Sequence, residues 1–194
     1  MRTRIITLLV ALLFGSIISF AQSEHLKFKG VPIDGTLREF TSKLEQKGFI
    51  TLLRENNSVT MNGPFAGHDD CTAYIFRNDK IDVVNGVVLY FPALDTWSLL
   101  EGQYTGTKDM LIEKYGEPFE CIEEFQSRIQ PTTDSDKMHE LRMERCTYKT
   151  TFITSSGRII ISLANQSYTN FCVQLMYIDN INSDIARQSI IEDL

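Results

Sequence analysis

The 194-residue sequence lacks most of the short motifs that reveal a catalytic centre or a cofactor site. No glycine-rich phosphate loop follows an expected strand, so a nucleotide cofactor is not implied. The four cysteines include no C-x-x-C pair, and the three histidines do not lie near them at zinc-like spacing. We therefore assign no catalytic, cofactor-binding or metal-binding residue from the sequence.

Clusters of lysine and arginine are also missing. The chain has 19 basic and 25 acidic residues, which gives a formal net charge of −6. Because nucleic-acid binding depends on a basic face that displaces counterions from phosphate, nucleic acid is not an expected partner. We interpret the excess of acidic residues mainly as a contribution to solubility. The alternative interpretation is a binding face for a cationic partner.

One apolar run lies at the N-terminus, and the rest of the sequence contains no apolar run long enough to span a bilayer. Arg2 and Arg4 precede the apolar residues 5 to 14, and small residues at Ser19 and Ala21 suit the recognition of a cleavage site. This pattern predicts a signal peptide over residues 1–21. The run itself is too short to cross a membrane.

Export of the mature chain, from Gln22 onward, is the consequence of that prediction. The first cysteine is Cys71, far from the expected cleavage site, so an N-terminal lipid anchor is not indicated. We expect a periplasmic or secreted protein that is not integral to a membrane.

Export also places the cysteines where disulfides form and persist. Four cysteines allow three pairings. A hairpin centred between residues 133 and 134 would set the second and third cysteines opposite each other, and the other two would then pair across the fold or remain thiols. The disulfide candidates are Cys71, Cys121, Cys146 and Cys172.

Hydrophobic periodicity alternates between helix and strand twice along the chain. A helix is expected over residues 36–47, followed by short strand segments over 49–91 that are rich in β-branched and aromatic residues. A second helix is expected over 95–116, strand segments over 119–178, and a short closing helix over 180–194. The turn between the strands of the second half is placed at Pro131 to Asp136.

The first helix has the firmest signals. Thr36 and Glu39 form a capping-box pattern, in which each side chain accepts a hydrogen bond from the backbone N–H of the other. Leu37, Phe40 and Leu44 follow at helical spacing.

This order predicts an α+β protein in which two tandem units, each a helix followed by antiparallel strands, share one large sheet with helices on one face. The units are residues 22–93 and 94–194. A sheet of this kind leaves its other face toward water, where an exported protein can meet a partner.

A cysteine nucleophile is one chemical hypothesis. Cys71 lies beside His68, Asp69 and Asp70, and a thiol needs a base to become a thiolate at neutral pH. Side chains so close together in a strand or tight turn rarely point the same way, so a disulfide is the preferred interpretation of this cysteine.

A pair of carboxylates is a second hypothesis, because glycosidases place two of them across a cleft. The same crowding of acids around a helix end is typical of a hydrated surface. The candidates are Glu113, Glu117, Glu120, Glu123 and Glu124.

A cation-binding loop is a third hypothesis, at Asp134-Ser135-Asp136 with His139 and Glu140 nearby. The glycine and the distal glutamate of a calcium loop are absent, so we interpret this segment as a polar hairpin tip.

Several large apolar residues at helical spacing are expected in the core instead of in a ligand site. Trp97 and Tyr104 share a helix face with Leu100. In the closing helix we expect Ile185 and Ile190 to point inward.

Residues 28–35, the Asp95-Thr96-Trp97 start of the second helix and the stop at residues 114–118 resemble uncharacterised exported proteins of Bacteroidetes. That resemblance implies a compartment and a fold, and no catalytic residue. The tandem helix-plus-sheet plan is also similar to the β-lactamase inhibitor protein family, whose members present a sheet to an enzyme. That second likeness is one of architecture.

These observations favour an exported, non-enzymatic binding or protein-interaction module, whose partner would be another envelope or extracellular protein. The alternative is a small hydrolase that acts on envelope polymer or glycan through paired carboxylates. A structural or assembly role in the cell envelope is a third possibility.

Overall fold

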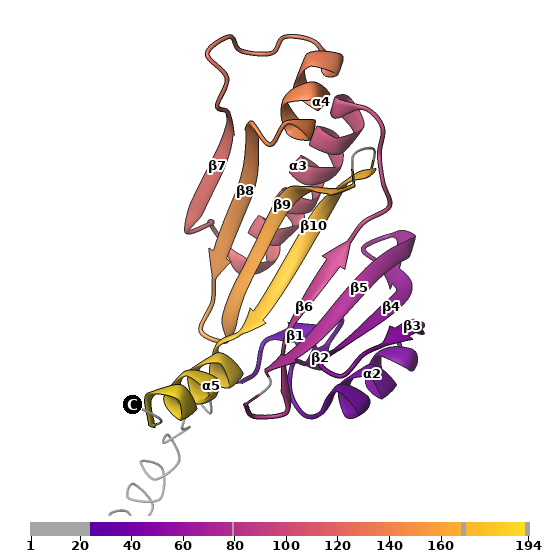
Figure 1. The fold of residues 1–194 in the computed structure, drawn as a ribbon, viewed down its shortest axis with the longest axis vertical. Helices are drawn as coiled ribbons and strands as arrows, with labels where there is room; N and C mark the ends of the chain where they lie inside the picture. The colour runs from indigo at the N-terminus through magenta and orange to yellow at the C-terminus, as the bar shows by residue number, and fades with distance from the viewer. Residues whose placement is uncertain (1–23, 79, 168–169, 193–194) are drawn as a thin grey trace, which may run out of the picture.

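The computed structural model describes residues 24–78, 80–167 and 170–192 (Figure 1). The predicted signal peptide, residues 1–21, lies outside the described residues. In chain order the elements are β1 (Lys27–Phe28), β2 (Val31–Pro32), α2 (Leu37–Glu45), β3 (Ile50–Arg54), β4 (Ser58–Phe65), β5 (His68–Asn78), β6 (Val83–Tyr90), α3 (Trp97–Tyr115), β7 (Glu120–Phe125), α4 (Asp134–Arg142), β8 (Cys146–Ile153), β9 (Gly157–Ser167), β10 (Asn170–Asp179) and α5 (Asn180–Glu192).

One antiparallel sheet of eight strands organises the molecule, in the order β3-β4-β5-β6-β10-β9-β8-β7. The strands before α3 make one half and those after it make the other (Figure 1). The halves join where β6 pairs with β10, with Tyr90 opposite Gln174. The predicted α+β class and single large antiparallel sheet are confirmed. A short β1–β2 ribbon forms a separate two-stranded sheet.

Helix α2 forms for the reasons that its sequence indicates. The Thr36 hydroxyl accepts a hydrogen bond from the Glu39 N–H at 3.3 Å, and the Glu39 carboxylate accepts one from the Thr36 N–H at 2.9 Å. Leu37, Phe40 and Leu44 are buried and belong to the main hydrophobic core. The predicted first helix and its capping box are confirmed.

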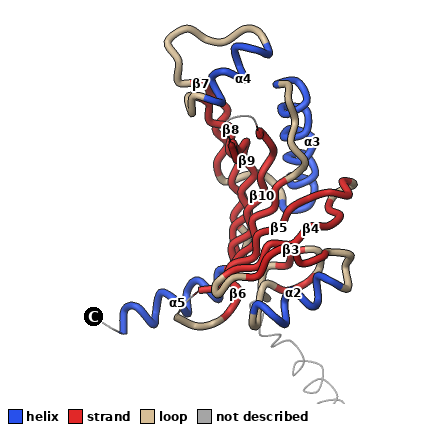
Figure 2. The backbone as a smooth tube through the Cα atoms, turned by 45° about the vertical axis from the view of Figure 1, so that its right-hand side comes forward, coloured by secondary structure: helices blue, strands red, loops and turns tan. Residues whose placement is uncertain are grey.

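Helix α3 is longer and runs unbroken from Trp97 to Tyr115 (Figure 2). Its N-cap residue is Thr96, and it stops at Gly116, whose φ of +82° suits glycine. Trp97 and Tyr104 are fully buried, so their predicted place in the core is confirmed. No helix among the described residues combines the length and the apolar character needed to cross a membrane.

Helix α4 corrects the predicted polar hairpin between residues 131 and 136. Thr133 and Asp136 form a second capping box, with the Thr133 hydroxyl accepting from the Asp136 N–H at 3.2 Å. The helix then buries Met138 and Leu141 against Trp97. The Thr-x-x-Asp spacing in the sequence is the local signal for this helix, whereas the cysteine positions favour a turn there.

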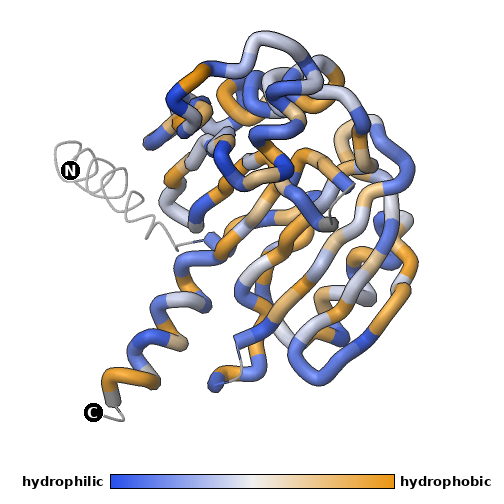
Figure 3. Tube along the Cα trace, turned by 45° about the horizontal axis from the view of Figure 1, so that its top comes forward, coloured by the Kyte–Doolittle hydropathy of each residue, from blue (hydrophilic) through white to orange (hydrophobic). Residues whose placement is uncertain are grey.

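Helix α5 corrects the prediction for the closing segment. Ile185 and Ile190 are 46% and 50% exposed, whereas Asn182 and Ala186 are buried. The Asn182 amide donates to the Ile33 and Val84 carbonyl oxygens, at 3.0 and 2.9 Å. The first turns of α5 thus attach to the end of the sheet, and the rest of the helix extends away from it (Figure 3).

Alternate strand residues define two faces of the sheet. Along the central strands, every other residue belongs to the same buried cluster as residues of α2 and α3, and we call this side of the sheet the helix-packed face. The residues between them point to the other side, which we call the second face. Across four central strands the paired residues are Ala73, Leu89, Leu175 and Ile161 on the helix-packed face, and Tyr74, Val88, Met176 and Ile160 on the second face.

Candidate functional site

Cys71 is a buried thiol and not an activated nucleophile. Its side chain is 0% exposed, and burial raises the pKa of the thiol to about 11. Its Sγ lies 3.9 Å from the carbonyl oxygen of Phe65. The His68 ring instead packs edge-to-face on Phe91, and its Nε2 lies 3.4 Å from Gln103. This arrangement does not support a Cys–His pair.

All four cysteines are free thiols in the described part of the chain. Strand pairing sets Cys121 opposite Thr150, and Cys146 opposite Phe125, so the predicted register that joins the two cysteines is wrong. The insertion of α4 between β7 and β8 is the reason, because the connection is not a simple hairpin. Cys71 and Cys172 lie on opposite faces of the sheet, which separates the remaining candidates.

The predicted carboxylates lie on different elements. Glu113 is on α3, Glu117 is in the connection after it, and the other three are divided between two sides of the edge strand β7. Glu123 faces α3 and forms an ion pair with Lys108, whereas Glu120 pairs with Lys149 at 3.0 Å on the second face. Burial alone would raise the pKa of Glu123, but hydrogen bonds from Lys108 and Cys121 outweigh it and lower the pKa. A glycosidase acid needs a raised pKa, so Glu123 does not have the required environment.

A polar network links that edge to the core. The Tyr104 hydroxyl lies 2.7 Å from the hydroxyl of Thr150, which donates to Cys121 Sγ at 3.2 Å. Cys121 in turn donates to Glu123 at 3.4 Å. Burial raises the pKa of Tyr104, because the charged phenolate would be poorly solvated. The network fastens α3 to β7 and β8.

The acidic segment at Asp134 serves a helix terminus. Its carboxylate accepts hydrogen bonds from the Ser98 N–H at 3.1 Å and from the Ser98 hydroxyl at 2.8 Å. These bonds lower the pKa of Asp134. Asp134 therefore satisfies a backbone donor in the first turn of α3, where Thr96 makes no side-chain cap. Within the described ranges, no group of three or more acidic, cysteine or histidine side chains is placed to hold a metal.

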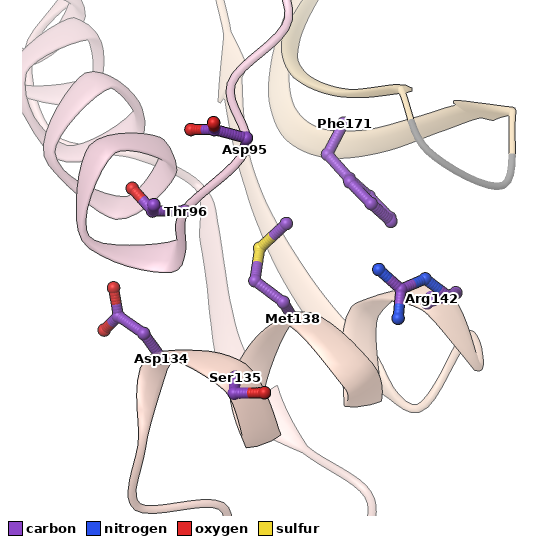
Figure 4. A pocket seen from close by; sticks show the side chains of 7 residues that line it. All are labelled: Asp95, Thr96, Asp134, Ser135, Met138, Arg142 and Phe171. Carbon is purple, nitrogen blue, oxygen red and sulfur yellow. The ribbon is translucent and has the colours of Figure 1, made fainter.

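A cleft of about 480 Å³ opens beside that contact, between α3, α4 and β10 (Figure 4). Asp95 and Asp134 stand at one side, and the Arg142 guanidinium lies 5.5 Å from the centre of the Phe171 ring at the other. The cleft is lined by apolar side chains together with polar and charged ones of both signs.

The second face is the larger candidate surface. Tyr74 is 38% exposed and its ring stacks on Phe76, with centroids 6.3 Å apart. Neighbouring apolar side chains continue this surface across β6, β10 and β9 in direct register. Its partly exposed apolar members are Tyr74, Phe76, Tyr90, Ile160, Met176 and Ile178.

Charge on the second face lies toward its margins. Lys149 and Glu120 pair with each other on β8 and β7, and Arg158 stands at the end of β9. Nearer the centre, small polar residues such as Thr72 of β5 and Ser162 of β9 lie beside the apolar residues of this face. The centre of the face is therefore uncharged, in a chain of net charge −6.

Comparisons with protein-family models, with curated proteins and with solved structures give no match to this chain.

Proposed function

We propose that the protein is an exported, non-enzymatic interaction module, and that the second face of its sheet binds another protein of the envelope or the extracellular space. The observation that carries the proposal is the uncharged apolar row that includes Tyr74, Val88, Met176 and Ile160 in direct register. Protein interfaces are enriched in aromatic residues and methionine at their cores and depleted of charge there.

The kind of partner follows from the backbone. Strands β5, β6, β10 and β9 are each paired on both sides, so their N–H and C=O groups bond within the sheet. A partner on this face meets side chains and not a free strand edge. A folded protein with its own apolar patch fits this surface better than an extended peptide does.

Export is supported by the N-terminal sequence pattern, in which Arg2 and Arg4 precede an apolar run and Ala21 ends a cleavage pattern. The N-terminal residue of the protein recovered from the envelope fraction tests this part. We expect it to be Gln22. Recovery of the uncleaved chain in the cytoplasm would contradict export.

The hydrolase alternative receives less support from the geometry. Of its candidate acids, Glu123 and Glu120 are engaged by lysines. A general acid of a glycosidase needs a raised pKa. Five carboxyl groups in the described part of the chain instead have pKa values below their ordinary values, namely Glu24, Glu39, Glu123, Asp134 and Glu140.

The test is affinity capture from an envelope extract of the source cells, with the wild type and two variants as bait. Tyr74→Glu places a charge in the apolar row, and Leu99→Glu is the matched control at a 53% exposed position of α3. We expect Tyr74→Glu to weaken binding of a recovered protein by about tenfold or more, as for an interface anchor. Equal binding by both variants, with unchanged thermal midpoints, would place the interface elsewhere.

A further inference from the structure

Two adjoining cavities lie on the opposite side of the sheet, near the C-terminal end of α3. One has a volume of about 150 Å³ and lies between α3, β10 and the turn after β4. The other has a volume of about 290 Å³ and lies against the first described residues and the β8–β9 turn. Lys114 and Tyr115 line both cavities, so the two are neighbours with a shared wall.

The smaller cavity is mainly apolar. Phe65 comes from the end of β4, Leu111 from α3, and Leu175 and Tyr177 from the helix-packed face of β10. A cavity of about 150 Å³ with apolar walls is large enough to hold a benzene ring. The position suits a small ring or a short alkyl chain, whose transfer from water would be favourable.

The larger cavity is lined by apolar, polar and charged groups, and it contains positive charge at its boundary with the smaller one. The Lys114 ammonium lies 4.9 Å from the centre of the Tyr115 ring, beside the shared wall. Lys27, on the other side, is paired with Glu24 at 2.9 Å. Lys114 is therefore the cation best placed to meet an anion that extends out of the apolar cavity.

We propose that these two cavities form one binding site for a small amphipathic carboxylate. The apolar part of the ligand occupies the cavity formed by Leu111 and Leu175, and the carboxylate lies beside the Lys114 ammonium. An ammonium is a compact, well-hydrated charge that suits a partly exposed carboxylate. The site does not depend on the proposed function, because it lies on the helix-packed side of the sheet.

The proposal is tested by titrating the purified protein with 3-phenylpropionate and following NMR shifts or heat. Two comparison compounds separate the parts of the ligand: 3-phenylpropan-1-ol keeps the ring and removes the charge, and propionate keeps the charge and removes the ring. We expect saturable binding of 3-phenylpropionate, binding of the alcohol that is about two- to fivefold weaker, and no saturation with propionate. Absence of saturable binding by both aromatic compounds would overturn the proposal.

Variants test the residues. Lys114→Gln should bring the affinity for 3-phenylpropionate to that of the alcohol and leave the alcohol unaffected. Lys43→Gln, which also removes a lysine from the last turn of a helix, should change neither. If the two lysine variants behave alike, the assigned carboxylate position is wrong.

Met110 gives a steric test of the apolar cavity. It lines the cavity from α3 and is 51% exposed, so Met110→Trp can be accommodated at the surface while covering the cavity. We expect this variant to lose binding of both aromatic compounds with little change in thermal midpoint. Undiminished binding would place the ring elsewhere and overturn the site.

Discussion

The two faces of the sheet are formed by the same strands, because neighbouring residues along each strand point to opposite faces. Leu175 on the helix-packed face is 1% exposed, whereas Tyr74 on the second face is 38% exposed. Residues of α2 and α3 supply the partners on the first face. The comparison shows that apolar content alone does not separate a core face from a binding face. The side chains of α2 and α3 that pack against the first face make the difference.

The largest expected difference between the faces concerns adjacent residues on β10. Leu175→Ala removes a buried side chain and should lower the free energy of unfolding by about 2–5 kcal/mol. Met176→Ala, on the partly exposed second face, should lower it by about 1 kcal/mol or less. Urea unfolding of both variants measures this. Equal losses would mean that the second face is as firmly packed as the first.

A tight contact within the second face predicts the next largest effect. A Cβ added to Gly86 would meet the Phe76 ring at 2.2 Å, so the ring must move. Gly86→Ala should destabilise the protein by about 1–3 kcal/mol. In the double variant with Phe76→Ala this clash is absent, so the two losses should not add. Additive losses in urea unfolding would show that the ring does not rest on Gly86.

The polar network on the helix-packed face predicts a smaller effect. Tyr104→Phe removes the hydroxyl that contacts Thr150 at 2.7 Å inside the core. We expect a loss of about 0.5–1.5 kcal/mol. Thr150→Val should remove the same interaction, and a double-mutant cycle should give coupling between the two sites. Zero coupling would show that the two hydroxyls do not interact.

Helix α4, which extends the helix-packed core, makes stability depend on pH. Hydrogen bonds from Arg145 and Ser127 hold the pKa of Glu140 at about 2, below its ordinary 4.5. Because the folded pKa is the lower one, this stabilisation is present above about pH 4.5 and is lost as the pH falls toward 2. The thermal midpoints of wild type and Glu140→Gln should differ most at neutral pH and converge near pH 2. A difference that stays constant over this range would contradict the assignment.

The smallest effect on stability is expected on the second face itself. Tyr74→Ala removes a ring that is 38% exposed, and we expect the free energy of unfolding to change by within about 0.5 kcal/mol. Urea unfolding beside the partner-binding assay separates the two roles. A large loss of stability would indicate that Tyr74 packs as a core residue.

Local signals predicted part of the fold well. The capping box at Thr36 and the spacing of Phe40 and Leu44 specify α2 without reference to the rest of the chain. Helix α4 has an equally local signal, the capping box from Thr133 to Asp136, which conflicts with the hairpin that the cysteine positions favour. Local patterns were therefore sufficient for both helices.

The candidate site could not be predicted in the same way. In β5 the successive residues Tyr74, Ile75 and Phe76 are all apolar, so alternation does not reveal which of them faces the helices. Their sides are set by long-range pairing, with Ile75 opposite Val59 of β4 and Val87 of β6. A shift of one residue in that register would exchange the two faces.

The sequence by itself determined the α+β class, the first helix and the succession of strands, because capping and periodicity act over a few residues. Only the tertiary structure decided that Cys121 lies opposite Thr150 and that Tyr74 stays partly exposed. It also brought Lys114 of α3 and Leu175 of β10 to one cavity. These arrangements depend on strand register and on which face a helix covers, and both are settled by contacts between residues far apart in the chain.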